Sequence, residues 1–424
     1  MGTAMSFLII NFFPLWSSIS LATVLLVGRY GLSNPISDAA VYALAASCMA
    51  CCLVGGPLLE GVVLLFCRQL RYIVTNNSTQ PLSFVVVDMT ASPSSLDERM
   101  QLKPPRYKVP IVYSKHYNIT AFGLERMHPF DSTKYGRVVE GLVAAGVLAN
   151  EDALFSPQPP SYTEMTHLHR LPYLLTLHYS ATLTRVLEVP VFYLPASIVR
   201  WRVLLPMLYQ TGGTVAAVHL AVRHGWSINL GGGFHHACRA SGGGFCIYAD
   251  LTLAVDTLRR HHAHIQKILL VDLDAHQGNG HERDFLGDPS VFIVDAYNAQ
   301  IYPCDVDAKP SIRLTISTPW TMDDATYLGA LKHTLQQAMD AFNPDFILYN
   351  AGTDCLAGDP LGNMQLSPAA VCARDRLVFD MAFRYLPEKR VPIAMVLSGG
   401  YQECNAPCIV DSIVALDRTF HLLS

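Results

Sequence analysis

Residues 268–280 read ILLVDLDAHQGNG, and this stretch decides the fold and the chemistry that the chain can support. An apolar run of Ile, Leu and Val without alternation is typical of a strand buried on both faces of a parallel sheet. The run leads into Asp272, Asp274 and His276, which alternate along an extended chain and therefore point the same way. A glycine-rich turn follows. The stretch predicts a buried strand that presents carboxylates and an imidazole at its carboxyl end.

Similar short apolar runs alternate with helical stretches from about residue 107 to the end of the chain. The expected strands are residues 110–114, 227–230, 268–274, 291–296, 312–316, 346–351 and 393–397. The clearest helical stretches are residues 212–224, 247–261, 323–342 and 368–384. This alternation predicts a layered α/β domain around a mostly parallel sheet. In such domains the chemistry lies in loops beyond the carboxyl ends of the strands.

Three potential metal ligands follow two of these strands. Asp354 ends the segment Asn350-Ala-Gly-Thr-Asp, at the end of the strand expected over 346–351, while Asp274 ends residues 268–274 and His276 follows them. Each residue alone has an ordinary structural explanation, such as a helix cap or a turn. Together they make two carboxylates and one imidazole with an open position, the ligand count of a catalytic zinc site. Iron or manganese would also suit two oxygens and one nitrogen.

Three further residues are candidates for proton transfer and charge stabilisation. His235 and His236 follow a Gly-Gly-Gly-Phe turn, and adjacent histidines suit a proton donor and acceptor better than two metal ligands. Asp272 can hold a ring N–H from behind. Tyr401, after Ser-Gly-Gly, can reach a developing oxyanion, although a packed core tyrosine is the alternative. This set predicts metal-assisted hydrolysis.

The order of these motifs resembles that of the zinc-dependent histone deacetylases, which have an arginase-like fold. Further stretches make the class IV branch the closer resemblance, and the whole covers about residues 107–424. These stretches are Tyr113-Ser, Tyr117-Asn-Ile, His128-Pro-Phe-Asp131, Gln210-Thr-Gly-Gly-Thr, 274–285 (DAHQGNGHERDF), Tyr297-Asn and Ile301-Tyr-Pro303. The resemblance implies an α/β, three-layer arginase-like fold with a central, mostly parallel sheet. It also implies hydrolysis of acyl-lysine amides in histones or other proteins, in the nucleus or cytoplasm.

The resemblance further implies a role for each candidate residue. His236 would act as general base and then general acid, His235 with Asp272 would tune charge, and Tyr401 would bind the acyl oxygen. Zinc would be held by Asp274, His276 and Asp354. A structural potassium ion would lie near the backbone of Asp272, Asp274 and His276. A narrow tunnel for the lysine side chain would be walled by Gly244, Phe245 and Tyr302.

Two positions depart from the common pattern of the family. Asn279 stands behind His236 where many members have Asp, and an amide orients the ring but does not stabilise an imidazolium as a carboxylate does. We therefore expect a less basic His236 and weak turnover of acetyl-lysine. Class IV members share this Asn and are associated with longer fatty acyl groups. Cys304 stands where relatives tend to carry Gly, which alters one pocket wall.

Three alternative functions share parts of this pattern. An arginase-type ureohydrolase binds two metal ions and would need a further Asp where Gly278 stands. The second metal ion would therefore lack its ligands here. An acetylpolyamine amidohydrolase would be favoured by an acidic cluster near the pocket mouth, and none is evident in the sequence. A non-catalytic deacetylase-like scaffold is disfavoured because all three ligands and Tyr401 are intact.

Composition limits the partners and the compartment. The chain has 424 residues and a net charge of −4, so no bulk basic charge indicates direct nucleic-acid binding. A role in chromatin regulation would have to run through protein substrates. The 11 cysteines show no repeated paired spacing, which favours free thiols in a reducing compartment.

The first 106 residues have no counterpart in the catalytic pattern. Residues 1–71 hold two long apolar segments, each near the roughly 20 residues that span a bilayer. They predict a transmembrane hairpin, and the basic residues Arg68 and Arg71 place the rest of the chain on the cytoplasmic side. The alternatives are a cleaved signal or single anchor, and a spurious extension. Residues 72–106 read as a linker and residues 107–424 as the catalytic domain.

Overall fold

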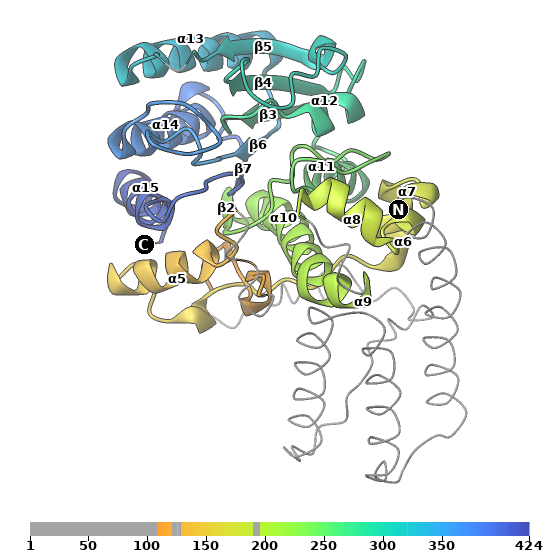
Figure 1. Cartoon of the computed structure of the whole chain (residues 1–424). Coiled ribbons are helices and arrows are strands. Elements are labelled where there is room, and N and C mark those ends of the chain that lie inside the picture. The colour runs from red at the N-terminus through yellow and green to blue at the C-terminus, as the bar shows by residue number, and fades with distance from the viewer. Residues whose placement is uncertain (1–107, 121–124, 126–128, 190–195, 320, 424) are drawn as a thin grey trace, which may run out of the picture. The chain divides into compact units, whose positions relative to one another are not determined.

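A seven-stranded sheet forms the centre of the computed structural model, and all of its neighbouring strands run parallel (Figure 1). The strand order is β1-β2-β7-β6-β3-β4-β5. The strands are β1 (Ile111–Val112), β2 (Trp226–Asn229), β3 (Ile268–Asp272), β4 (Val291–Tyr297), β5 (Ile312–Ser317), β6 (Phe346–Asn350) and β7 (Ile393–Val396). The seven strands predicted from apolar runs are all present.

The structure describes residues 108–120, 125, 129–189, 196–319 and 321–423. The predicted hairpin in residues 1–71 and the linker in residues 72–106 lie outside the described residues. Among the described residues, none of the helices combines the length and hydropathy that a bilayer crossing needs.

Alternate residues of the strands pack into two separate hydrophobic cores. In β3, Leu269 and Val271 belong to one core, while Ile268 and Leu270 belong to the other. Both faces of the strand are therefore covered, which explains why its sequence is continuously apolar.

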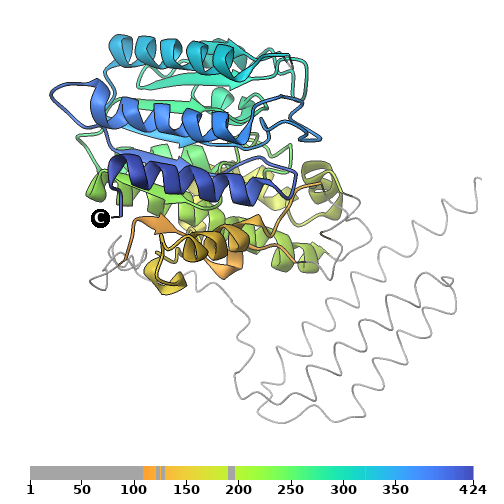
Figure 2. The ribbon, with the colours of Figure 1, turned by 90° about the vertical axis from the view of Figure 1, so that its left-hand side faces the viewer.

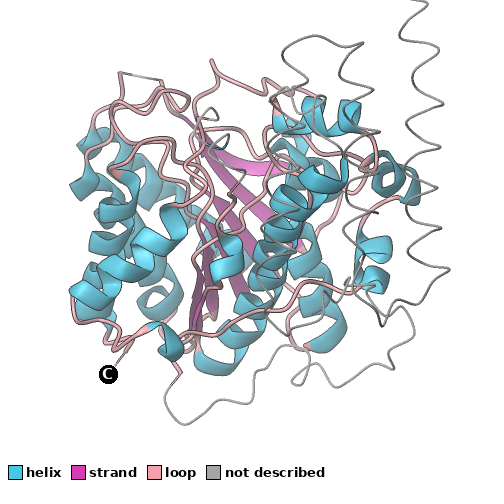
Figure 3. Ribbon diagram, turned by 60° about the horizontal axis from the view of Figure 1, so that its bottom comes forward, coloured by secondary structure: helices cyan, strands magenta, loops and turns pink. Residues whose placement is uncertain are grey.

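Helices cover both faces of the sheet and complete three layers (Figure 3). One face is covered by a row of four helices, as Figure 2 shows. They are α5 (Lys134–Ala144), α13 (Asp324–Phe342), α14 (Pro368–Asp380) and α15 (Asn405–Phe420). The other face is covered by α10 (Leu205–His224), α11 (Asp250–His261) and the short α12 (Asn279–Asp284).

Local signals explain where several of these helices begin and end. The side chains of Asp323 and Ser367 cap α13 and α14 by accepting hydrogen bonds from Thr326 N and Ala370 N. Helix α10 ends at His224 and is followed by the capping residue Gly225, whose φ of 84° is in the left-handed region that favours glycine.

Helix α10 begins seven residues earlier than residue 212, where we expected it. Gly212 and Gly213 look like a boundary in the sequence, but both lie inside the helix. A Cβ atom on Gly212 would lie 1.9 Å from the carbonyl oxygen of Gln158, so the glycine permits another segment to pass against the helix. The helix is also buried along most of its length, so its sequence lacks an amphipathic period.

A group of short helices packs beside α10 around a third apolar core. They are α6 (Tyr162–Leu168), α7 (Leu171–Thr176), α8 (Ser180–Leu187), α9 (Ala196–Val199) and the π-helical turn η5 (Arg200–Leu204). Ser161 and Glu164 form a capping box at the start of α6. This group covers the loop at residues 242–249, because Tyr173 donates a hydrogen bond to Ile247 O (2.7 Å) and Phe245 N donates to Val186 O (3.0 Å).

Strand β3 is shorter than the predicted range of residues 268–274. It ends at Asp272, and after one more backbone hydrogen bond, from Leu273 N to Asn350 O (3.0 Å), side chains replace the ladder. Asp274 N donates to Asp272 Oδ1 (3.2 Å) and His276 N donates to Asp274 Oδ1 (3.0 Å). The acidic side chains thus bend the chain into the loop that carries them.

Candidate active site

Four adjacent strands bring the candidate residues to one edge of the sheet. In the order of the sheet, β2 leads to His235 and His236, β7 to Tyr401, β6 to Asp354, and β3 to the segment 272–276. Since all four strands are parallel, their carboxyl ends lie at the same edge. Residues spread over 167 positions of sequence therefore meet in one place.

Asp274, His276 and Asp354 form a buried group of potential metal ligands. One ligand atom from each lies within 4.8 Å of the others. The Nδ1 atom of His276 is 2.8 Å from Asp354 Oδ2 and 3.2 Å from Asp274 Oδ1. The expected Asp₂His arrangement is therefore geometrically available.

Backbone and hydroxyl donors orient the two ligand carboxylates. Ala275 N donates to Asp354 Oδ1 (2.8 Å), while Ser398 Oγ (2.7 Å) and Gly399 N (2.8 Å) donate to Asp274 Oδ2. A Cβ atom on Gly399 would lie 2.4 Å from Asp354 Oδ2, so glycine is needed for this close approach. One oxygen of each carboxylate is thereby held from behind.

The charges of this group favour a bound cation. Burial and the nearby charge of Asp274 raise the pKa of Asp354 to about 7. Burial would lower the pKa of His276, but its hydrogen bonds to the two carboxylates outweigh burial and raise the pKa to about 10. Two buried carboxylates that compete for one imidazole are what a divalent cation would neutralise. The donor set therefore fits zinc.

His235 and His236 lie side by side but have different partners. Their ring centroids are 4.1 Å apart. His235 Nδ1 donates to Asp272 Oδ2 and His236 Nδ1 donates to Asn279 Oδ1, both at 2.9 Å. One ring thus rests on a carboxylate and the other on an amide.

The two rings consequently differ in proton affinity. Burial would lower the pKa of His235, but the charges of Asp272 and Asp274 outweigh it and raise the pKa to about 9. Burial, together with His235 and His276, holds the pKa of His236 well below its ordinary value. A charged ring beside a neutral one is suited to general acid–base chemistry.

Asp272 receives more hydrogen bonds than the sequence suggested. Besides His235 and Asp274 N, it accepts from Asn350 Nδ2 (2.9 Å) and His281 Nε2 (2.8 Å). We missed His281 and Asn350, although both lie inside the motifs quoted above. Asp272, His281 and Asp295 form a second buried group that could hold a metal ion. The potassium ion expected in this region stays a prediction.

Lys134 is another residue that sequence reasoning missed. It lies at the start of α5, is fully buried, and its Nζ donates to the carbonyl oxygens of Ser398 and Gly399 (2.9 Å to the latter). Burial lowers the pKa of Lys134 to about 8. A lone basic residue about 260 positions from its partners leaves no recognisable signal in the sequence.

Tyr401 lies over the metal-ligand group. Its ring packs edge-on against Phe245 and His276, with centroids 6.1 and 6.2 Å away, and its backbone N–H donates to Asp359 Oδ2 (2.9 Å). Burial and the charges of Asp354 and Asp274 raise the pKa of Tyr401 well above its ordinary value. The hydroxyl therefore keeps its proton and can act as a donor.

Of the three expected tunnel residues, Gly244 and Tyr302 lie against His236, and Phe245 lies against Tyr401. The ring of Tyr302 meets His236 edge-on at 4.9 Å and is 46% exposed, so it lies where the site opens. Gly244 (φ 50°) and Phe245 (φ 68°) both have left-handed backbones. A Cβ atom on Gly244 would lie 2.4 Å from His236 Cδ2, so only glycine lets this loop pack against the ring.

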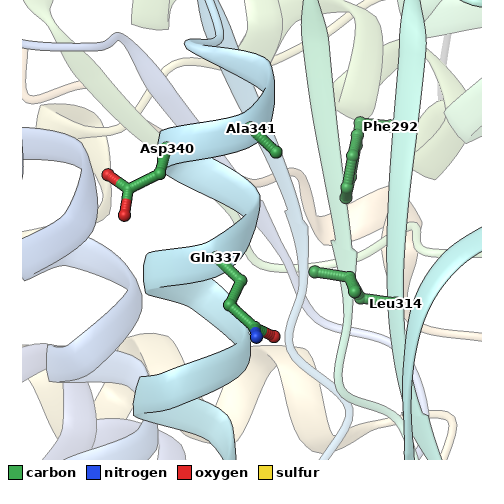
Figure 4. A pocket seen from close by; sticks show the side chains of 5 residues that line it. All are labelled: Phe292, Leu314, Gln337, Asp340 and Ala341. Carbon is green, nitrogen blue, oxygen red and sulfur yellow. The ribbon is translucent and has the colours of Figure 1, made fainter.

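A surface hollow elsewhere carries no comparable chemistry. Figure 4 shows it between α13 and the strands β4 and β5, which supply none of the site residues predicted from the sequence. It is lined by Phe292, Leu314, Gln337, Asp340 and Ala341.

Comparisons with known proteins identify the family and the fold of the chain. The family described as histone deacetylase domain matches residues 128–416. "Histone deacetylase 2" of Arabidopsis thaliana is 42% identical over 330 residues, which are 76% of this chain and 82% of the relative. An uncharacterised protein of Picosynechococcus is 33% identical over 294 residues, covering 69% of this chain and 92% of the relative. The crystal structure of the HDA15 HD domain has the same fold, with a TM-score of 0.58, 21% identity, and coverage of 74% and 89% of the two chains.

Proposed function

The chain belongs to the histone deacetylase family, and from this premise we propose that it is a zinc-dependent hydrolase of acyl-lysine amides in proteins, of the class IV branch. The observation that carries the proposal is the buried group Asp274, His276 and Asp354 beside two histidines of opposite proton affinity. A metal-ligand group alone would fit many functions. The added acid–base pair indicates hydrolysis.

The zinc ion would be held by Asp274, His276 and Asp354. When bound there, it would polarise the acyl carbonyl and lower the pKa of a water molecule, as zinc does in hydrolases. The remaining catalytic work falls to side chains of the protein.

His236 would move the protons. Its Nδ1–H is donated to Asn279, which leaves the lone pair on Nε2 available. The low pKa of His236 keeps the ring neutral, so Nε2 would accept a proton from the attacking water and pass it to the leaving lysine amine. His235 is held on Asp272 and would keep a positive charge beside the reaction.

Tyr401 would stabilise the charge that develops on the acyl oxygen. A phenol with a raised pKa donates a hydrogen bond without losing its proton. Gly244, Phe245 and Tyr302 would enclose the aliphatic part of the substrate lysine, as the tunnel requires. We propose histones or other acylated proteins as substrates, and a potassium ion near Asp272 as a structural component.

We extend the proposal to long fatty acyl groups. Asn279 cannot stabilise a protonated His236 as a carboxylate would, so acetyl-lysine should be turned over slowly. Binding of a long acyl chain would compensate, because remote binding energy can assist the chemical step.

The test is to purify the full chain with zinc and to compare acetyl-lysine and myristoyl-lysine peptides, with H236A as the blank. We expect zinc-dependent hydrolysis of both peptides, faster for myristoyl-lysine. A preference for acetyl-lysine would contradict the argument from Asn279 but leave the hydrolase intact. Hydrolysis of neither peptide would refute the proposal. Acetylated polyamines in the same assay would then separate a polyamine amidohydrolase from a scaffold.

The organisation of the whole chain also stays a proposal. Residues 107–424 would form the catalytic domain, and residues 1–71 would anchor it to a membrane on the cytoplasmic side. Family membership alone would place the protein in the nucleus or cytoplasm. Fractionation of cells that express the full chain would separate these locations.

A further inference from the structure

The amide of Asn279 lies between the proposed base and a carboxylate that neither the motif nor the family comparison indicates. On one side, Asn279 Oδ1 accepts from His236 Nδ1 (2.9 Å). On the other side, Asn279 Nδ2 donates to Asp305 Oδ2 (3.0 Å). Three side chains thus form a continuous chain of hydrogen bonds that ends at Nδ1 of His236, on the side of the ring opposite Nε2.

The direction of the Asn279 amide determines which nitrogen of His236 carries the proton. With the amide oxygen toward His236, Nδ1 must be the donor, and Nε2 keeps the lone pair that a base needs. With the amide turned over, its NH₂ group would face Nδ1, and the proton would move to Nε2. That tautomer cannot accept a proton from water. An amide alone permits both arrangements, whereas a carboxylate at position 279 would permit only the first.

Asp305 removes this ambiguity. An ionised carboxylate only accepts, so the atom of Asn279 that faces Asp305 must be the NH₂ group, whichever way the amide is drawn. Burial would raise the pKa of Asp305, but hydrogen bonds from Asn279 and Arg283 outweigh it and lower the pKa below its ordinary value. Asp305 is therefore ionised at neutral pH.

Asp305 is itself held firmly. Arg283 binds it through two nitrogens, with Nε 2.8 Å from Oδ2 and one terminal nitrogen 2.6 Å from Oδ1. The backbone of Asp305 is paired with the Gln277 side chain in both directions, at 2.9 and 3.0 Å. The Asp305 side chain is only 12% exposed, although Arg283 is 44% exposed.

We propose that Asp305 is a positioning residue, which fixes the direction of the Asn279 amide and, through it, the tautomer of His236. The inference rests on the proposed function, because it takes His236 as the general base. It explains how a chain with an amide at position 279 still prepares its base: the missing carboxylate lies one residue further out.

The test uses the full chain with zinc and three variants: D305A, N279D and N279D/D305N. In D305A the amide can turn over, so we expect kcat to fall about 10- to 100-fold with little change in KM, which is less than or equal to the lower end of what a general base contributes. N279D sets two acceptors against each other and should also lose activity. The double variant restores an acceptor toward His236 and a donor–acceptor pair behind it, so its kcat should return to within a few-fold of wild type.

The outcome of the double variant separates positioning from mere packing. If Asp305 only fills space or stabilises the loop, N279D/D305N should be at least as poor as the single variants, and this result would overturn the proposal. An unchanged kcat in D305A would overturn it as well. D288A is the matched control, because Asp288 forms a similar ion pair with Arg259 (2.7 Å, side chains 26% and 31% exposed). It should lose stability to a similar degree without loss of kcat.

A second readout does not depend on substrate. Nitrogen-15 NMR of histidine-labelled protein distinguishes the two tautomers of a neutral ring. We expect the His236 signal of wild type to show a protonated Nδ1, and that of D305A to show mainly a protonated Nε2. An identical tautomer in both proteins would contradict the inference. If wild type hydrolyses no acyl-lysine while D305A still changes the tautomer, the proposed function fails and the role of Asp305 stands.

Discussion

His235 and His236 show how much of the chemistry is decided by the partner of a single residue. The two rings are neighbours in the chain and in space, and both are buried. Asp272, fully buried and itself bound by four donors, keeps its charge next to His235. The neutral amide of Asn279 gives His236 no such charge. Exchange of roles between the two histidines is therefore excluded by their partners.

Tyr401 gives the first prediction at this scale. Tyr401→Phe removes only the hydroxyl and keeps the ring contacts with Phe245 and His276. If the hydroxyl binds the developing oxyanion, kcat should fall about 100- to 1,000-fold with a nearly unchanged KM, as for other oxyanion donors. Steady-state kinetics on the preferred acyl-lysine peptide would measure this, with zinc content as the control. If KM rises and kcat stays unchanged, the hydroxyl acts in ground-state binding of the substrate instead.

The sequence revealed the residues that lie in compact motifs and missed those that act from a distance. Asp274, His276 and Asp354 each follow an apolar run, so their positions could be predicted from strand ends. Lys134 and Asp305 lie in unrelated segments, and their roles depend on which loops meet at one sheet edge. Which loops meet is a property of the tertiary fold, and it cannot be predicted from the local pattern of a single sequence.

Among the elements, α14 links the two strand ends that carry the ligands. Its Arg374 is fully buried and donates to Leu273 O (3.1 Å), after β3, and to Gly352 O (2.6 Å), after β6. The same guanidinium donates to Asp375 Oδ1 (2.9 Å). The helix therefore holds the loops of β3 and β6 from one face of the sheet.

Removal of this cation should loosen both loops. In R374M, Asp375 loses its buried partner and two carbonyls lose their donor, so the free energy of unfolding should fall by about 3–5 kcal/mol. Urea unfolding at fixed zinc concentration would measure this, and zinc affinity should fall as well. R384M is the control, because Arg384 pairs with Asp380 at the surface (56% and 31% exposed) and should cost at most about 1 kcal/mol. Equal losses in the two variants would contradict this account.

The helices α6 and α7 meet at a buried histidine that should make stability depend on pH. His169 Nε2 accepts from Ala249 N (3.2 Å), and burial lowers the pKa of His169 from 6.5 to about 4. The folded state thus disfavours the protonated ring. The contribution of neutral His169 to the free energy of unfolding is complete above pH 6.5. This contribution is lost as the pH falls from 6.5 toward 4, by about 3 kcal/mol at most.

The variant H169Q tests this, because Gln keeps a donor and an acceptor but does not titrate. Its free energy of unfolding should fall less than that of wild type between pH 7 and pH 5. H167Q, at an exposed position of α6, should retain the wild-type slope. Equal slopes in H169Q and wild type would show that other groups cause the acid sensitivity.

At this scale the strands were easier to predict than the helices. Strands of a two-faced parallel sheet leave unbroken apolar runs, as β3 and β6 do. Helices α6–α9 are short and pack on a small core of their own, so their sequence shows no long period. The predicted start of α10 was wrong, because the glycines inside this helix permit close packing and do not mark a boundary.

On the scale of the whole molecule, one sheet edge collects every candidate residue, and the described residues alone supply both cores beneath it. The edge strand β1 belongs to this unit. It pairs with β2, and Tyr117 just beyond it donates to Asn229 Oδ1 (2.7 Å) at the end of β2. Residues near 110 therefore support the loop that leads to His235.

This arrangement predicts where the chain can be cut. A fragment of residues 108–424 keeps β1 and both cores, so it should fold alone, bind zinc and hydrolyse acyl-lysine peptides with the kcat/KM of the full chain. A fragment of residues 134–424 lacks β1 and Tyr117, which leaves a cavity beside Asn229 and an unpaired strand edge, so it should unfold more easily and lose activity. Circular dichroism, zinc content and peptide hydrolysis of the two fragments would measure this. If the longer fragment also fails to fold, the residues before 108 are part of the catalytic unit, and the proposed boundary at 107 is wrong.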